Sequence, residues 1–254
     1  MAEAAQNPDP ALATDAQESA DAPFSGTVET FHEDGTTLAE RAYLKDGLPE
    51  GETQIYSAEG TLIQTAHFRQ GVLDGELRVF EDGGGLFQKA GYAKGVLDGR
   101  MLLYTEGRLA AMINYVDGVQ EGEFVIYSEL GDPSMRMHYL RGKPHGEALY
   151  YYPSGNLAKR AKYVQGLLEG EVIDYDEEGG VLERATYRRG RLEGERRRYH
   201  PNGKTKEVAV FKEGKLAEAV EEYDESGNLK APLGADGKPA QSRISTFLEK
   251  LVKG

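Results

Sequence analysis

Five histidines are the side chains of this sequence with the most scope for metal or acid–base chemistry. They are His32, His67, His138, His145 and His200. No two have the short spacing of zinc ligands, and the sequence has no cysteine to complete such a site. No nucleophile has a recognisable base beside it, and no glycine-rich loop leads into a Lys-Ser/Thr helix start. We therefore expect a protein that is not an enzyme, with no metal site and no cofactor.

A recurring glutamate is the second chemically capable group. Its members are Glu52, Glu76, Glu123, Glu147, Glu171 and Glu195. A column of carboxylates could suggest a calcium ladder. However, its members occur once per repeat, roughly 10 Å apart at two strands per repeat, which is too far to share one ion. We expect them instead to accept hydrogen bonds from turn amides or to pair with Lys and Arg across strands.

A cluster of cations between residues 184 and 206 is a candidate contact surface. From it we select five arginines as candidate partner-binding residues: Arg188, Arg189, Arg191, Arg196 and Arg198. They could meet an acidic partner surface or phosphate. The alternative is a solvated strand face, because Glu193, Glu195 and Glu207 are interleaved with them.

A second candidate contact surface is an apolar, aromatic zone in the middle of the chain. Its residues are Tyr104, Phe124, Ile126, Tyr127, Tyr150, Tyr151 and Tyr152. Tyrosine-rich surfaces commonly anchor protein partners, because the ring buries a large area and the hydroxyl can form a hydrogen bond. The two candidate surfaces together predict a protein partner.

The elements that position these residues come from an internal repeat of about 24 residues. One aromatic column runs Phe31, Tyr56, Phe80, Tyr104, Tyr127, Tyr151, Tyr175, Tyr199 and Tyr223. A second column runs Tyr43, Phe68, Tyr92, Tyr115, Tyr139, Tyr163, Tyr187 and Phe211. A glycine follows each aromatic within a few residues, so every unit holds two strand-length runs and two tight turns.

Short turns between short strands can only join antiparallel neighbours. The sequence therefore predicts an all-β fold: an elongated array of about nine β-hairpin units that form one long twisted sheet. Roughly 17 strands would extend on the order of 80 Å.

Alternation along the strands predicts which face is buried. In the run that ends at Tyr163, the Leu, Ala and aromatic ladder is the expected buried face, and the Lys and Arg side is the expected wet one. The strands that follow Gly-Glu carry apolar residues on both sides in the middle of the array. The sheet could curl into a trough there, or one side could await a partner.

Three segments divide the chain. Residues 1–23 are acidic and poor in large apolar side chains, which predicts a disordered tail. Residues 24–230 hold the repeats, and residues 231–254 are predicted to form a loop and a helix. In that last segment Ile244, Phe247, Leu248 and Leu251 share one helical face. This helix would cap the last strand or, alternatively, dock onto another protein.

Composition limits location and partners. The formal net charge of −13 argues against nonspecific binding to nucleic acid or anionic lipid. No run of apolar residues is long enough to span a membrane. The N-terminus lacks the basic and apolar regions of a signal peptide, which predicts a cytoplasmic protein. A periplasmic location is the alternative, if a signal peptide was removed.

The repeated pattern aromatic-x-x-Gly-x-Leu-x-Gly-Glu-x-x-x-Tyr-x-x-x-Gly resembles the bacterial MORN-repeat variant found in YwqK-family antitoxins. Clear copies run from Phe68 to Gly84, Tyr163 to Gly179 and Tyr187 to Gly203. The resemblance covers about residues 24–230, although Arg100 replaces one glutamate of the pattern. It implies an elongated sheet of stacked hairpins and an antitoxin or immunity protein that neutralises a toxin or effector by covering its surface. A self-associating structural scaffold or envelope-associated interaction protein, and a lipid-surface module, are alternative functions.

Overall fold

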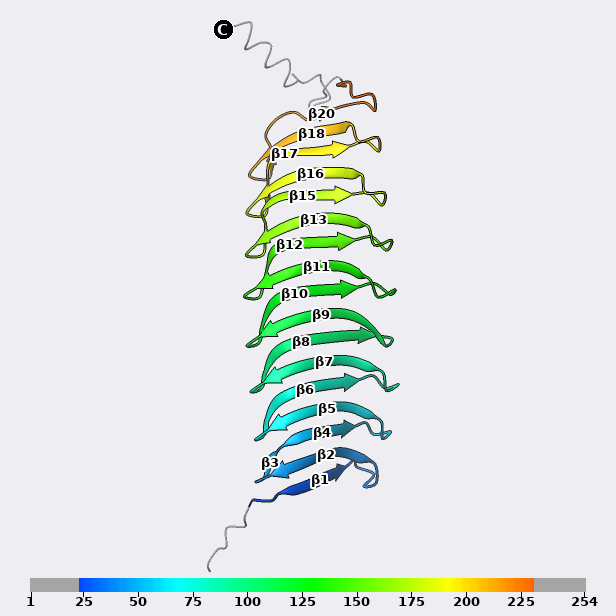
Figure 1. Cartoon of the computed structure of the whole chain (residues 1–254), viewed down its shortest axis with the longest axis vertical. Helices are drawn as coiled ribbons and strands as arrows, with labels where there is room; N and C mark the ends of the chain where they lie inside the picture. The colour runs from blue at the N-terminus through cyan, green and yellow to red at the C-terminus, as the bar shows by residue number, and fades with distance from the viewer. Residues whose placement is uncertain (1–22, 231–254) are drawn as a thin grey trace, which may run out of the picture.

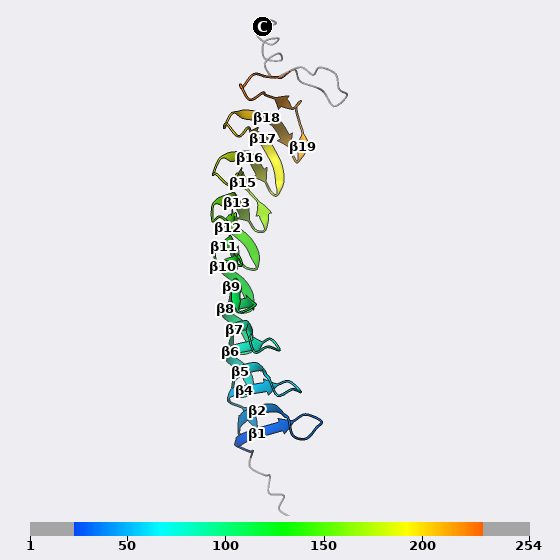
Figure 2. The same cartoon turned by 90° about the vertical axis from the view of Figure 1, so that its right-hand side faces the viewer.

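The computed structural model describes residues 23–230. The predicted acidic tail and the predicted C-terminal helix lie outside these residues, apart from the tail's last position. Within them the chain forms one open antiparallel sheet, a single layer thick, with successive strands stacked along the long axis (Figures 1 and 2). This confirms the predicted all-β array of hairpins.

The strands are β1 (Gly26–Phe31), β2 (Leu38–Lys45), β3 (Leu48–Pro49), β4 (Gly51–Tyr56), β5 (Leu62–Arg69), β6 (Val72–Phe80), β7 (Leu86–Ala93), β8 (Val96–Thr105), β9 (Arg108–Val116), β10 (Val119–Tyr127), β11 (Pro133–Leu140), β12 (Lys143–Tyr151), β13 (Leu157–Val164), β14 (Leu167–Leu168), β15 (Gly170–Tyr175), β16 (Val181–Arg188), β17 (Arg191–Tyr199), β18 (Thr205–Lys212), β19 (Lys215–Leu216) and β20 (Glu221–Glu222). Three pairs, β3 with β4, β14 with β15 and β19 with β20, are two halves of one strand position, because both halves pair with the same preceding strand.

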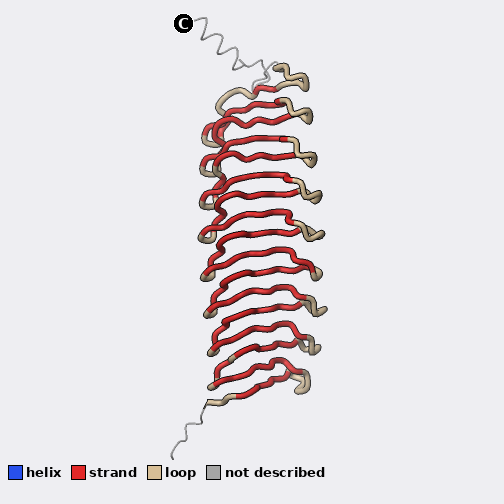
Figure 3. Tube along the Cα trace, in the orientation of Figure 1, coloured by secondary structure: helices blue, strands red, loops and turns tan. Residues whose placement is uncertain are grey.

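Two kinds of connection alternate along the sheet. On one long edge, two-residue turns join the strands, and both turn residues have positive φ, as at Gln70 (50°) and Gly71 (78°). This is the type I′ geometry whose twist matches that of a β-hairpin. On the opposite edge most connections are longer loops that close with a backbone hydrogen bond, as from Ser57 N–H to Thr61 O at 2.8 Å. These loops are the tan segments along the right side of Figure 3. The exception is the two-residue turn Glu106-Gly107 between β8 and β9.

A β-bulge interrupts almost every pairing beside the long loops. In the hairpin of β12 and β13, Tyr150 faces Lys159 but Tyr151 faces Leu157, so Ala158 is the extra residue. The same shift recurs one unit later, between Asp174 and Tyr175. Bulges bend the strand that contains them and increase its twist. The strands in Figure 1 accordingly bow instead of running straight.

The buried centre of the sheet is a ladder of residues that face one another from strand to strand. It runs Val28, Ala42, Thr53, Ala66, Leu77, Ala90, Met101, Ile113, Phe124, Met137, Ala148, Ala161, Val172, Ala185, Arg196 and Ala209. We call the side of the sheet that carries this ladder face A and the opposite side face B. Ala90 and Ala148 are fully buried.

The aromatic columns correct the predicted burial in part. The small residues beside them are buried as expected, but most of the rings are only half-buried, and Phe31 and Tyr43 are exposed. A single-layer sheet has no second layer to cover large rings. The column that contains Tyr163 lies on face A, and the column that contains Tyr151 follows a face A residue directly and lies on face B.

Candidate protein-contact surface

Large apolar side chains gather on face A in the middle of the array. They lie on β8 to β12, in two adjacent rows set by the strand register. We call this set the central block: Met101, Ile113, Phe124 and Met137 in one row, and Leu103, Ala111, Ile126, Met135 and Tyr150 in the other. Each member faces another member across the neighbouring strand, so the block is continuous over five strands.

Side-chain contacts hold the block in shape. The ring of Phe124 meets that of Tyr139 edge to face, with centroids 5.9 Å apart and planes at 78°. Burial, together with a hydrogen bond to Tyr163, raises the pKa of the Tyr150 hydroxyl. Despite these contacts, Ile126 is 38% exposed. The block is therefore ordered and yet open to a partner.

Face B is closed by its own ion pairs. Glu123 Oε1 lies 2.9 Å from Arg136 Nη1, and Glu171 Oε1 lies 3.2 Å from Arg184 Nη1. Val125 and Ile173 lie among these groups and are 0% and 2% exposed. Long Arg and Lys stems can cover apolar neighbours while their charged ends reach carboxylates.

The ion pairs of face B bear out part of the interpretation of the glutamate column. Glu76 pairs with Arg78 and also with Lys89, at 2.6 Å from Lys89 Nζ. Glu195 similarly lies 2.6 Å from Arg197 Nη2. The Glu76 pair with Lys89 links β6 to β7 as predicted, whereas the Glu195 pair with Arg197 lies within β17. Among the described residues no cluster of side chains could hold a metal ion.

The structure separates the predicted aromatic contact residues. Phe124, Ile126 and Tyr150 belong to the central block on face A. Each of the other three column tyrosines directly follows a block residue in its strand and therefore lies on face B: Tyr104, Tyr127 and Tyr151. The predicted zone is thus two surfaces on opposite sides of the sheet.

Tyr152, the remaining member of that zone, serves the array itself. Its hydroxyl donates a hydrogen bond to the carbonyl of Tyr175 in the next unit, at 2.7 Å. His32 and His200 occupy the same repeat position, and their Nε2 atoms lie 3.0 Å and 2.9 Å from the carbonyls of Tyr56 and Tyr223. The position therefore joins neighbouring units.

The predicted arginine patch also divides. Arg196 and Arg198 lie on face A in β17, where they contact carboxylates. Arg196 contacts Glu207, and Arg198 lies 2.7 Å from Glu183 and 3.6 Å from Glu207. The Arg196 guanidinium also stacks 5.2 Å from the ring centre of Phe211. Its side chain is only 19% exposed, so Arg196 belongs to the sheet's own packing.

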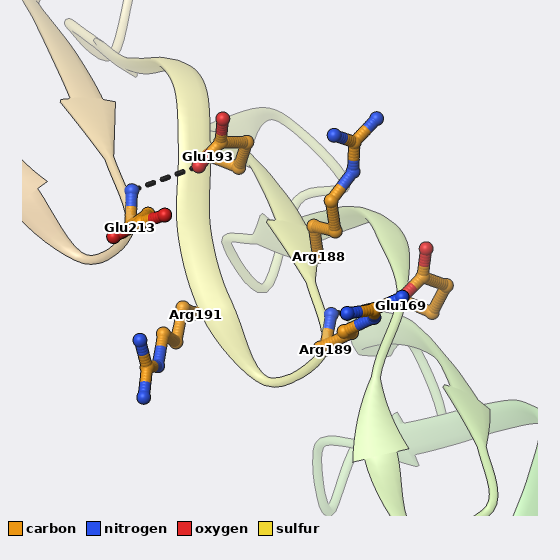
Figure 4. A pocket seen from close by; sticks show the side chains of 6 residues that line it. All are labelled: Glu169, Arg188, Arg189, Arg191, Glu193 and Glu213. Carbon is orange, nitrogen blue, oxygen red and sulfur yellow. Dashed lines mark hydrogen bonds between the residues drawn. The ribbon is translucent and has the colours of Figure 1, made fainter.

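Arg188, Arg189 and Arg191 surround a tight turn on the edge of the sheet. They line an open hollow of about 620 Å³ with Glu169, Glu193 and Glu213. Figure 4 shows the guanidinium groups of Arg188 and Arg191 pointing away from each other. The hollow mixes both charges, with three arginines and three glutamates, and so has no strong preference for one sign of ligand.

Sequence reasoning missed a second carboxylate column, which stabilises the tight turns. Its members are Glu50, Asp74, Asp98, Glu121, Glu169 and Glu193. Each accepts a hydrogen bond from the backbone N–H of the positive-φ residue in the next turn, as Glu121 does from Arg141 at 2.7 Å. The period of about 24 residues could have shown this column.

One unit lacks the carboxylate of this second column. In β12 the equivalent residue is His145, whose Nδ1 is buried and has no hydrogen-bond partner within residues 23–230. The carboxylate-to-turn hydrogen bond of the other units is therefore missing in β12, the strand that also carries Tyr150 of the central block.

No helix in the described part of the chain is long and apolar enough to cross a membrane.

Two stretches of the chain match a model of a known repeat family. Residues 144–165 and 192–213 match the family model described as the MORN repeat variant. Each matched stretch starts in a strand after a tight turn, continues through the next long loop, and ends at the following tight turn. A search of curated proteins finds no match.

Solved structures give only remote likenesses. A chain of "Crystal Structure of TcdB2-TccC3-Cdc42" is similar at 10% identity over 84% of this chain, with a TM-score of 0.19. A chain of "Crystal Structure of TcdB2-TccC3" is similar at 11% identity over 84%, with a TM-score of 0.14. This chain spans 13% and 17% of those chains, and such TM-scores carry no argument. The structure is an array of β-hairpins, and two stretches of it match the MORN repeat variant.

Proposed function

We propose that this protein is a non-enzymatic binding protein that holds a second protein against the central block. The observation that carries the proposal is the block itself. It is a continuous apolar surface on a single-layer sheet, and no other described element lies over it. Apolar patches of this kind on soluble proteins commonly mark interaction sites.

The arrangement suits binding by occlusion. Phe124 and Tyr150 supply aromatic contact area, and their positions are held by the strands and by contacts with Tyr139 and Tyr163. Preorganised aromatic anchors lose little entropy on binding. Covering a partner's surface needs no catalytic residue.

We further propose that the partner is a toxin or secreted effector, which the protein neutralises. The resemblance of the repeat to that of YwqK-family antitoxins motivates this narrower proposal. The match to the MORN repeat variant supports a repeat-based binding module, and the partner's identity is the part that an experiment must supply.

A capture experiment with matched variants tests whether the central block binds a protein, and it supplies the partner needed to test neutralisation. The wild-type chain, Ile126→Arg and Leu130→Arg would each be used as bait in lysate of the source cells. Ile126 belongs to the block, and Leu130 is an 80% exposed loop residue outside it. We expect one stoichiometric protein that is retained by Leu130→Arg and lost by Ile126→Arg. Equal capture by all three baits would contradict the block as the binding surface.

The captured protein then tests the narrower proposal. It would be expressed in cells with and without the chain, and growth would be measured. Growth arrest that the wild-type chain relieves and Ile126→Arg does not relieve is the expected result. A partner that is harmless on its own would reject neutralisation and leave the binding role intact.

A further inference from the structure

We propose that residues 242–253 of the same chain dock on the central block when no partner occupies it. This inference concerns the surface used in the proposed function, but it does not require that any external partner exists. Three properties carry it: the apolar pattern of the segment, the charges on both sides, and the length of the chain that connects them.

The segment has an apolar stripe of suitable size. Ile244, Phe247, Leu248 and Leu251 share one face if residues 242–253 are helical. Twelve helical residues span about 18 Å, which corresponds to about four strand spacings of the sheet. The central block covers five strands, so the stripe fits within it.

Charge complements this fit. Arg243 and Lys250 are seven residues apart and therefore lie on one flank of the stripe. The β8–β9 and β10–β11 connections, which join strands of the block, carry the opposite sign. Their acidic residues are Glu106, Glu129 and Asp132. Of these only Glu106 forms an ion pair within the described part of the chain, with Arg108.

The connection is long enough to reach the block within one chain. Lys230 pairs beside β20, since its N–H donates to the carbonyl of Glu222. From there to β12, which carries Tyr150, are seven strand spacings, or about 34 Å. The fourteen residues from Lys230 to Ile244 span up to about 46 Å when extended. A tethered segment within reach experiences an effective concentration on the order of mM.

Disulfide trapping tests the docking, because the chain has no native cysteine. Leu248→Cys, which lies in the apolar stripe, would be combined with Met135→Cys on face A or, as matched control, with Leu149→Cys on face B. Met135 and Leu149 lie on adjacent strands and are both half-buried. The full chain would be oxidised gently, and bridged species would be separated by mass.

We expect the Met135 pair to form a bridge within one chain about tenfold faster than the Leu149 pair, as an effective concentration raised on one face predicts. Replacing the other stripe residues, Ile244, Phe247 and Leu251, by Ser should remove that advantage. Equal rates for the two pairs would overturn the proposal, and so would bridges that form only between two chains. The experiment contains no partner protein, so its failure is distinguishable from failure of the capture experiment.

Discussion

Two regions of face A use the same repeat positions for opposite purposes. In the central block, Phe124 meets Tyr139 edge to face. Three units later the same two positions hold Arg196 and Phe211, which form a cation–π contact 5.2 Å from the ring centre. The backbone register is alike at both places, since Phe124 faces Met137 and Arg196 faces Ala209.

The residues on the neighbouring strands explain how the same repeat positions hold Phe124 with Tyr139 in one place and Arg196 with Phe211 in the other. Arg196 lies between Ala185 and Ala209, and these small side chains leave space for its long stem. Glu207 and Glu183 then supply the carboxylates. Phe124 lies between Ile113 and Met137 and has only apolar contacts across the strands. The strands β16 to β18 thus pair the charges of Arg196 and Arg198 within the sheet, whereas the central region leaves apolar area open.

The largest loss of stability is expected from breaking the ion pairs that Glu207 forms with Arg196 and Arg198 on face A, which we call the ion network. Glu207→Ala removes the carboxylate that contacts Arg196 and that lies 3.6 Å from Arg198, while Arg196 stays mostly buried. Leaving a buried charge without its partner costs about 3 kcal/mol of unfolding free energy. Chemical denaturation would measure it, with Glu225→Ala in an exposed loop as control. A loss equal to that of the control would show that the network does not stabilise the sheet.

Truncating the aromatic in the central block should cost less. Phe124→Ala removes a half-buried ring and its contact with Tyr139, for which we expect about 2 kcal/mol of destabilisation. The same denaturation experiment applies. Phe87→Ala, at a 46% exposed ring outside the block, is the control. If both variants lost the same stability, the block would not be a packed unit.

Converting one region into the other should change stability little. Arg196→Met together with Glu207→Leu replaces the ion pair by apolar groups of similar size. Such replacements are often neutral, and we expect a change within about 1 kcal/mol. The variant should also gain exposed apolar surface on face A, which binding of a hydrophobic dye would report. A strongly destabilised double variant would mean that the ion network specifies this part of the array.

The smallest effect concerns pH on face B. Burial acts to raise the pKa of Glu76, but Lys89 and Arg78 outweigh it, so the pKa lies below its ordinary value. Its ion pairs therefore stabilise the fold above the ordinary glutamate pKa and are lost as pH falls through the lowered one. An NMR titration should show a midpoint that rises in Lys89→Met. An unchanged midpoint would exclude this pairing in solution.

Much of the array could be predicted from the sequence. The columns of Gly71, Gly142 and their equivalents predicted the tight turns, since glycine adopts positive φ without steric cost. The alternation around Ala161 correctly predicted a buried column. The candidate contact surface was predicted only in part, because Ile126 and Tyr127 were grouped although neighbouring residues in a strand point to opposite sides.

The sequence by itself determined the period, the number of strand positions and the apolar centre, because these depend on local spacing and residue type. It predicted two tight turns per unit, whereas in nearly every unit one of the two connections is a longer loop. Only the tertiary structure decided which columns share a face and which charged side chains form ion pairs within the sheet. Those properties depend on cross-strand register and on the bulges beside Tyr151 and its equivalents. Because of the register, Phe124 belongs to the open apolar block on face A, whereas Arg196, at the same repeat position, forms an ion pair with Glu207.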